Sequence, residues 1–174
     1  MEAKNSKLSP EEQEQLTALL KRVQLPVSYD LFLAIMGAFP SVPVELAVFN
    51  EKGEVLLFHR EDKEFTGYHS PGTVYRFGET VNTALERVKK AELPGLSLTT
   101  PIILGWHENN HGNGYGQNPT RHEISLIHAC ELIGPYEGEG KFFPIDQLPD
   151  NMVPHHIILV PEIAKRFKYF KAQK

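Results

Sequence analysis

Apolar residues near the start of the chain recur every three or four positions, as they do on one face of a helix. These positions are Leu16, Leu19, Leu20 and Val23. Ser9 can cap this helix, Pro10 suits its first turn, and Glu12 completes a capping box. After a break at "QLPVS", the run "YDLFLAIMGAF" predicts a second short helix that ends near Gly37 and Pro40.

Residues 1–39 are therefore interpreted as a helical extension that precedes the main domain, residues 40–174. Two short helices cannot bury both apolar faces by themselves, so we expect the extension to pack on the main domain or on a second subunit. An arrangement in which these helices are an integral first layer of the domain fits the pattern equally well. We expect a homodimer, and the sequence leaves open whether the extension mediates it.

From Val42 onward, the helical spacing gives way to short runs of strand-forming residues. The runs "VELAVFN" and "VLLFHR" flank the turn "EKGE", which predicts a β-hairpin centred on Gly53. The segment "EDKEFTGYHSPGT" is interpreted as a loop that leads to a helix beginning near Glu79. Helical spacing places four apolar residues on the core face of that helix: Ala84, Leu85, Val88 and Leu93.

The second half of the chain continues this alternation of helices and strands. Pro94 and Gly95 end the helix, and the runs "PIILGW", "HEISLIHACELI" and "KFFPI" predict strands. The polar, glycine-rich "HENNHGNGYGQNPTR" is typical of a functional or mobile loop. The run "HHIILVPEIAKRFKYF" predicts a final helix, which Pro161 should kink or interrupt.

The bulk composition limits the class of protein. A chain of 174 residues, 41% hydrophobic and 23% charged, can bury one core of ordinary size. Its net charge of -4 and pI near 6.1 argue against the broad basic surface that binds a nucleic-acid polymer. A small local basic site for phosphate remains compatible with this charge, so we expect a small-molecule partner and no nucleic acid polymer.

Cysteine content and apolar run length bear on location. The single cysteine, Cys130, lies in an apolar stretch and has no second cysteine with which to form an internal disulfide. The start "MEAKNSKLSPEEQEQ" lacks the apolar core of a signal peptide, so we expect a cytoplasmic protein. The longest apolar runs, "LFLAIM" and "HHIILV", are far below the roughly 20 residues that cross a bilayer, so no membrane partner is expected.

Candidate chemistry gathers in residues 70–96, "SPGTVYRFGETVNTALERVKKAELPGL". Pro71 and Gly72 allow a sharp backbone turn and offer carbonyl oxygens, so a divalent cation could lie between a backbone oxygen there and the carboxylate of Glu92. The plainer interpretation is a solvated helix face with weak ion pairs. Helical periodicity alone favours the plainer interpretation.

The same stretch resembles the Nudix box, whose pattern is G-x5-E-x7-R-E-U-x-E-E-x-G-U, where U is a bulky apolar residue. The segment "PGTVYRFGET" is similar to the common opening of the box, with Gly72 and Glu79 at matching positions. Arg87 falls at the box arginine, with seven residues between it and Glu79. The resemblance implies that Glu79 pairs with Arg87 to hold the helix rather than performing chemistry.

The match weakens after Arg87. Val88 and Ala91 replace two glutamates of the box, Glu92 keeps the third, and Pro94 displaces the glycine. Several Mg2+ ions bridging a pyrophosphate need several carboxylates, whereas one octahedral Mg2+ needs one or two, plus waters and substrate oxygens. The resemblance therefore implies one Mg2+, or Mn2+, held by Gly72, Glu92 and Glu137.

One branch of the family, the GDP-mannose mannosyl hydrolases, has a similarly reduced box, and its "ERLTMAELG" is close to "ERVKKAELPG" at residues 86–95. A weaker likeness extends over residues 42–170. It places Glu45 at an acidic position, Arg60 at an arginine that contacts phosphate, and His107 near a site histidine. The resemblance implies an α/β/α sandwich with a mixed sheet.

The general base is the part of the resemblance that this chain departs from. A Gln-His pair of that branch precedes its "YRWL" segment, but "YEGEG" stands before "KFFP" here, with Glu137 near the glutamine and Gly138 at the base position. Glu137, Glu139 and His107 are the candidate catalytic residues. A carboxylate beside a cation has a lowered pKa and is a weaker base than histidine.

The remaining polar and aromatic candidates are weighed against burial. Arg76 and Tyr68 join Arg60 as candidate substrate-binding residues, although aromatic residues of a small domain usually belong to the core. Alternation puts His122 and His128 on one strand face, where a hydrogen-bonded core or rim position is expected. The adjacent pair at 155 and 156 is given no role, because adjacent side chains are expected to point apart.

The sequence thus favours a Mg2+-dependent hydrolase of a nucleoside diphosphate linked to another moiety, with a nucleotide sugar such as GDP-mannose preferred. Attack at phosphorus and attack at the anomeric carbon of the sugar both stay open. The alternative is a catalytically inactive module of the same fold that binds a nucleotide or a protein partner, which the replacements at Val88 and Ala91 would explain.

Overall fold

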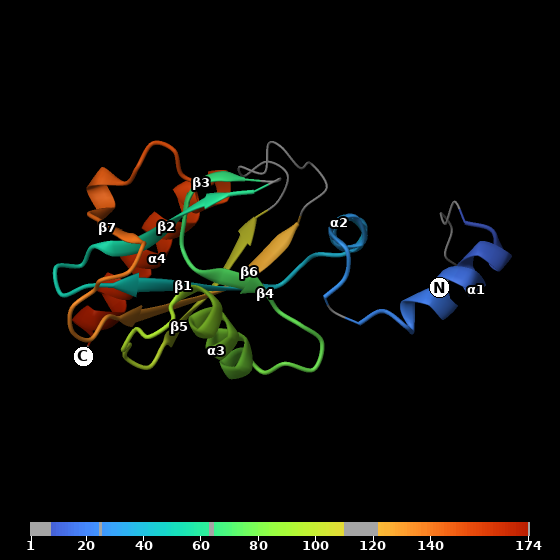
Figure 1. Cartoon of the computed structure of the whole chain (residues 1–174), viewed down its shortest axis with the longest axis horizontal. Coiled ribbons are helices and arrows are strands. Elements are labelled where there is room, and N and C mark those ends of the chain that lie inside the picture. The colour runs from blue at the N-terminus through green and yellow to red at the C-terminus, as the bar shows by residue number, and fades with distance from the viewer. Residues whose placement is uncertain (1–7, 25, 63–64, 110–121, 174) are drawn as a thin grey trace. The chain divides into compact units, whose positions relative to one another are not determined.

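The computed structural model describes residues 8–24, 26–62, 65–109 and 122–173 (Figure 1). The chain divides into two compact units, Met1–Ile35 and Met36–Lys174. None of the helices within the described residues is long and apolar enough to cross a bilayer.

The two helices expected near the start of the chain are present. Helix α1 spans Pro10–Leu20 and helix α2 spans Tyr29–Ala38. The capping box at the start of α1 forms as expected, because the Ser9 hydroxyl accepts from the backbone N–H of Glu12 and the Glu12 carboxylate accepts from the N–H of Ser9. Neither helix has a buried residue, so the leucine face of α1 is exposed.

The larger unit is built on a mixed sheet with the strand order β3-β2-β1-β6-β5, with β4 paired to β1 and β7 paired to β2. Strands β1 and β6 are parallel, and the other pairs of named strands are antiparallel. The strands are β1 (Pro43–Phe49), β2 (Val55–Glu61), β3 (Thr66–His69), β4 (Gly72–Val74), β5 (Ile102–Asn109), β6 (Glu123–Glu131) and β7 (Lys141–Phe143).

The β1–β2 hairpin confirms the turn expected at Gly53, whose φ of +78° lies in the left-handed region that glycine adopts readily. The segment interpreted as a loop before Glu79 instead contains β3 and β4, and the helix begins at Val81 with Thr80 as its N-cap. Strands of four and three residues show too little alternation to be recognised in a sequence. Pairing with β2 and β1 defines them.

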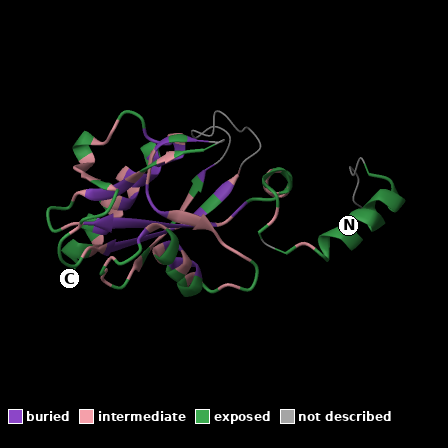
Figure 2. Ribbon diagram, viewed as in Figure 1, coloured by how far each residue is buried: buried purple, intermediate pink, exposed green. Residues whose placement is uncertain are grey.

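Two helices cover opposite faces of the sheet, α3 (Val81–Glu92) and α4 (Pro154–Ala172). Successive residues of β1 point alternately to the two faces, and every residue of the strand is buried (Figure 2). The apolar face of α3 packs as expected against Val44, Leu46 and Val48. The result is the α/β/α arrangement with a mixed sheet that the sequence predicts.

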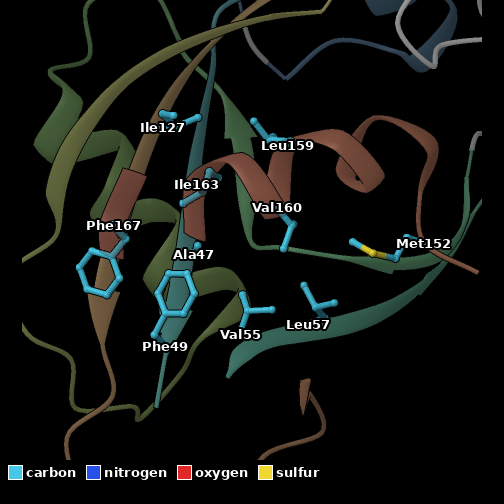
Figure 3. Packing of buried hydrophobic residues seen from close by; sticks show 11 residues of the cluster. Ala47, Phe49, Val55, Leu57, Ile127, Met152, Leu159, Val160, Ile163 and Phe167 are labelled. Carbon is cyan, nitrogen blue, oxygen red and sulfur yellow. The ribbon is translucent and has the colours of Figure 1, made fainter. Parts of the chain in front are cut away.

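The core on the α4 side gathers residues from several elements (Figure 3). The rings of Phe49 on β1 and Phe167 on α4 stack with their centroids 4.9 Å apart. A short 3-10 helix, η1 (Ile145–Gln147), contributes Ile145 at the border of this core. Helix α4 is thereby fixed over β1, which places its first turn beside the start of that strand.

Pro161 lies inside α4, which is continuous, so of the two expected effects an interruption is wrong and a kink stays a prediction. A proline inside a helix costs about 3 kcal/mol. Leu159, Val160 and Ile163 are fully buried around it, and each such side chain contributes about 2 kcal/mol. Packing on the sheet therefore outweighs the local cost of the proline.

Candidate functional site

A buried carboxylate stands in the middle of the otherwise apolar strand β1. Glu45 is only 6% exposed and lies opposite Gly72 of β4 in the antiparallel pair. A Cβ atom at Gly72 would lie 2.6 Å from Glu45 Oε2, closer than such atoms approach. The absence of a side chain at position 72 therefore makes room for the Glu45 carboxylate.

The same glycine contacts a second carboxylate. Glu92 is the last residue of α3, and its Oε1 accepts a hydrogen bond of 3.3 Å from the backbone N–H of Gly72. Gly72 and Glu92, which the sequence names as a candidate metal site, thus lie together, although the atom of Gly72 in this contact is the amide nitrogen and the metal-binding role of both residues stays a prediction. Gly72 lies between two carboxylates, one from the sheet and one from the helix.

The surroundings disfavour the charged form of both acids. Burial raises the pKa of Glu45 to about 8, although the positive charge of Arg60 opposes the shift. Burial also raises the pKa of Glu92 to about 7, and the negative charge of Glu45 adds to this shift, while the Gly72 N–H and Arg60 oppose it. A divalent cation between the two carboxylates would relieve this repulsion, so the donor set fits a metal ion.

A histidine of α4 lies beside Glu45. His156, in the first turn of α4, is 3% exposed, and its Nε2 lies 3.4 Å from Glu45 Oε2. Burial lowers the pKa of His156 to about 3, so its ring is neutral and this contact is not an ion pair at neutral pH. The ring stacks on that of His69, with centroids 6.0 Å apart.

The position of His156 corrects the sequence argument about the adjacent pair at 155 and 156. Their ring centroids lie 4.2 Å apart, so the two side chains point to the same side. Adjacent residues diverge by about 100° around an ideal helix axis, but these two occupy the first turn of α4, where their rings are nevertheless in contact. His156 therefore belongs to the site, a residue that sequence analysis missed.

Arg60, near the end of β2, supplies positive charge at this place. Its side chain is 40% exposed and forms an ion pair with Asp62. The guanidinium also lies over the ring of Phe65, 5.5 Å from the centroid. Because Arg60 is held by its neighbours and affects the pKa of both carboxylates, it is positioned to meet an anionic group beside them.

The turn before α3 is held by the expected pair of Glu79 and Arg87. Arg87 Nε and Nη2 each donate to a Glu79 carboxylate oxygen at 2.8 Å. Arg87 also donates to the Val74 carbonyl at 3.0 Å and to the Thr73 hydroxyl at 2.5 Å. The pair ties β4 to α3 and so fixes Gly72 relative to Glu92.

The other two candidate substrate-binding residues have different surroundings. Tyr68 on β3 is partly buried against the core, with its ring edge-on to Phe143 at 5.1 Å. Arg76 lies between β4 and α3, where its backbone N–H donates to Glu79. A role in substrate binding stays a prediction for both residues.

His107 lies apart from the two carboxylates. It is on β5, and β1 and β6 separate this strand from β4, which is roughly 14 Å of sheet at ordinary strand spacing. Its Nδ1 lies 2.5 Å from a Glu162 carboxylate oxygen of α4. The structure therefore does not bring His107 to Gly72 or Glu92.

Glu137 and Glu139 are exposed in the segment between β6 and β7. Lys141 pairs with Leu57 of β2, and a Cβ at Gly140 would touch Leu56 and Phe58, so this segment lies along the first half of β2. Their catalytic and metal-binding roles stay predictions.

The described residues contain no group of three histidine, cysteine or acidic side chains spaced to hold a metal ion. A cation at Gly72 would therefore have two carboxylates, with water and substrate oxygens completing its shell, which is the way Mg2+ is usually bound. Glu45 has a signal in the sequence, because a single charged residue interrupts an apolar strand. His156 has no such signal, since only tertiary packing brings α4 to β1.

Known proteins with a similar sequence pattern or fold were identified by comparison. The NUDIX domain family pattern matches residues 40–163. A solved ADP-ribose pyrophosphatase from Streptococcus suis is similar to this chain, with 19% identity and a TM-score of 0.53 over 75% of this chain and 92% of that one. A NUDIX hydrolase from Nitrosomonas europaea has 15% identity and a TM-score of 0.57 over 76% and 91% of the two chains.

A solved UDP-X diphosphatase is also similar, with 17% identity and a TM-score of 0.55, and the match covers 97% of this chain and 74% of that one. At these identities the structural likeness shows the fold alone. The site must therefore be argued from the residues of this chain.

Proposed function

This chain belongs to the NUDIX domain family, and from that membership we propose that it is a Mg2+-dependent hydrolase of a nucleoside diphosphate linked to another moiety. A nucleotide sugar such as GDP-mannose is the preferred substrate, because "ERVKKAELPG" resembles the mannosyl hydrolase branch. Two similar structures are named for related compounds, ADP-ribose and UDP-X, which supports a substrate of the same general class.

One observation carries this proposal: Gly72 lies between the carboxylates of Glu45 and Glu92, with Arg60 close enough to lower the pKa of both. A diphosphate carries negative charge, and two acids beside one arginine would repel it. A bound Mg2+ would reverse the local charge and make a water molecule at the site more acidic. The arrangement is suited to a metal-bound anionic substrate.

Each residue has a proposed part in the reaction. Arg60 binds a phosphate oxygen through its exposed guanidinium, and Glu92 and Gly72 hold the cation. The Glu79–Arg87 pair keeps Gly72 and Glu92 in register without touching substrate. Glu137 and Glu139 remain the candidates for accepting a proton from water, whereas His107 is too far from Gly72 for that step in this arrangement.

Product analysis by phosphorus NMR tests the proposal and separates the two routes. GDP-, ADP- and UDP-sugars and nucleoside triphosphates would be incubated with the protein in Mg2+, beside Glu92→Gln and the exposed helix variant Glu86→Gln. We expect turnover by the wild type and by Glu86→Gln that disappears with EDTA and falls at least about a hundredfold in Glu92→Gln. Nucleoside diphosphate plus free sugar would indicate attack at the anomeric carbon, and monophosphates attack at phosphorus.

An inactive binding module is the second candidate function. The observation that favours it is the reduced metal site, since the described residues contain no group of three metal-binding side chains and Val88 is buried in the core. This candidate predicts that GDP-mannose raises the melting temperature without any product at high protein concentration. Turnover above the rate of Glu92→Gln would exclude it.

A further inference from the structure

We propose that Glu45 on β1 is a metal ligand, which supplies from the sheet the second carboxylate that the helix lacks. This inference rests on the proposed function, because it concerns the cation of the same site. It adds a ligand that the box pattern does not contain, from a strand that precedes the box in sequence.

The residues at the two altered box positions cannot serve as ligands. Val88 is apolar and 1% exposed, in the core between α3 and the sheet. Ala91 has no donor atom. Among the three positions of α3 where the pattern has glutamates, the carboxylate of Glu92 alone remains, and it reaches toward β4. A second protein oxygen for the cation must come from another element.

Glu45 meets the geometric requirement for that oxygen. Its carboxylate lies against the Cα of Gly72, since a Cβ there would be 2.6 Å from Oε2 and 3.0 Å from Oε1. The carboxylate of Glu92 bonds the amide of the same glycine. The two carboxylates also affect each other, because the negative charge of Glu45 raises the pKa of Glu92. Two carboxylates of this kind are suited to sharing one Mg2+.

Burial gives an independent indication that Glu45 is completed by a ligand. Its Oε2 is buried and has no hydrogen-bond partner among the described residues, and both ring nitrogens of His156 are in the same situation. A buried polar atom without a hydrogen-bond partner is costly, and natural proteins rarely keep one without a role. Arg60 is 40% exposed and already pairs with Asp62, so it does not enclose the Glu45 carboxylate.

His156 completes this arrangement as a positioning residue. Its neutral ring carries one N–H, and with the proton on Nε2 it can donate to Glu45 Oε2 after a small closure of the 3.4 Å separation. Because a carboxylate oxygen has two lone pairs, that bond would fix the carboxylate and leave Oε1 and the second lone pair of Oε2 for the cation. Hydrogen bonds of this kind commonly orient the carboxylates that hold metals.

Manganese binding to the whole protein, measured without nucleotide by the EPR signal of free Mn2+, tests the inference. The proteins compared are the wild type, Glu45→Gln, Glu92→Gln and the matched control Glu86→Gln, whose carboxylate is on the exposed side of α3. We expect Glu45→Gln and Glu92→Gln each to raise the Kd for Mn2+ about tenfold or more, and Glu86→Gln to leave it unchanged.

A thermal measurement provides a second readout. Excess Mn2+ should raise the melting temperature of the wild type and of Glu86→Gln, and this rise should be lost in Glu45→Gln. If Glu45→Gln does not fold, Glu45→Asp keeps the charge but shortens the side chain, and it should bind Mn2+ more weakly than the wild type.

The outcomes separate this inference from the proposed function. Unchanged Mn2+ affinity in Glu45→Gln or Glu45→Asp, with affinity lost in Glu92→Gln, would overturn the role of Glu45 and leave the hydrolase proposal intact. A lower melting temperature of Glu45→Gln with an unchanged Kd would show a purely structural role. A wild type that binds no Mn2+ would overturn the inference, while the product analysis would still decide whether nucleotides are cleaved.

Discussion

Arg87 joins three parts of the turn before α3, because its guanidinium bonds Glu79, Thr73 and the Val74 carbonyl. Replacing it with methionine roughly keeps the size of the side chain but removes these bonds and leaves Glu79 without its charged partner. We expect Arg87→Met to lower the free energy of unfolding by about 2 kcal/mol, measured by urea denaturation. Glu86→Gln, which removes an exposed ion pair with Lys89, should change it by less than about 0.5 kcal/mol.

The same pair has a predictable pH dependence. The hydrogen bonds that Glu79 accepts from Arg87 lower the pKa of Glu79 from 4.5 to about 2. Because the folded pKa is the lower one, the stabilisation is fully present above about pH 4.5 and is lost as the pH falls toward 2. Urea denaturation at pH 6 and pH 3 should show a smaller loss of stability in Glu79→Gln than in the wild type. Equal losses in the two proteins would contradict this assignment.

Cys130 is a buried thiol whose chemistry follows from its surroundings. Burial raises the pKa of this thiol to about 12, and the side chain is 1% exposed. The thiolate is the reactive form, so the folded protein should not react with a thiol-specific reagent at pH 8 over an hour. Denaturation in urea should expose one reactive thiol per chain, and rapid labelling of the folded protein would contradict the prediction.

Strand β3 depends on a close approach of backbone to backbone. Gly67 has a φ of +146°, and a Cβ there would lie 2.3 Å from the carbonyl oxygen of Asn151. The neighbouring Tyr68 bonds that segment through its own N–H and C=O groups. We expect Gly67→Ala to lower the free energy of unfolding by about 3 kcal/mol or more, measured by urea denaturation.

Gly53 offers a matched control for this substitution. Its φ of +78° is also left-handed, but no atom lies within 4 Å of the position that a Cβ would occupy. Gly53→Ala should therefore lower the free energy of unfolding by about 1 kcal/mol, the cost of the left-handed backbone conformation alone. Equal destabilisation by the two variants would mean that the contact with Asn151 contributes nothing.

Elements with a long periodic pattern could be predicted from the sequence, and those defined by pairing could not. The capping box of α1, the hairpin at Gly53 and the apolar face of α3 depend on neighbours in sequence, and all are present. Strands β3 and β4 are too short to show alternation. The continuity of α4 through Pro161 depends on burial, which local rules do not include.

The candidate site divides in the same way. Glu79, Arg87, Gly72 and Glu92 lie within one stretch of the sequence and could be named from a family resemblance. Glu45 and His156 come from β1 and α4, which meet only in the folded sheet. His107 shows the converse, since the structure places it on β5, in contact with Glu162 of α4 and away from Gly72.

At the scale of the whole molecule, α1 presents a leucine face without a buried residue. Leu16, Leu19 and Leu20 are 44%, 58% and 45% exposed. We expect a homodimer in solution, with a mass by light scattering of twice the 19.7 kDa of the chain. If this leucine face forms the dimer contact, the double variant Leu16→Lys/Leu19→Lys should have the mass of a single chain.

The prediction has a control on the same helix. Gln13→Lys, which adds a charge to α1 but removes no leucine, should leave the mass unchanged. A monomeric wild type at tens of micromolar protein would contradict the expectation of a dimer.

The parallel pairing of β1 with β6 also determines when the molecule can assemble. Val44 pairs with Leu126, so the central contact of the sheet joins residues roughly eighty positions apart, and closing so large a loop slows folding. During synthesis, β1 leaves the ribosome long before β6 is made. The edge of β1 that pairs with β6 therefore has no partner strand until the second half of the chain follows. We therefore expect the nascent chain to depend on chaperones over this interval.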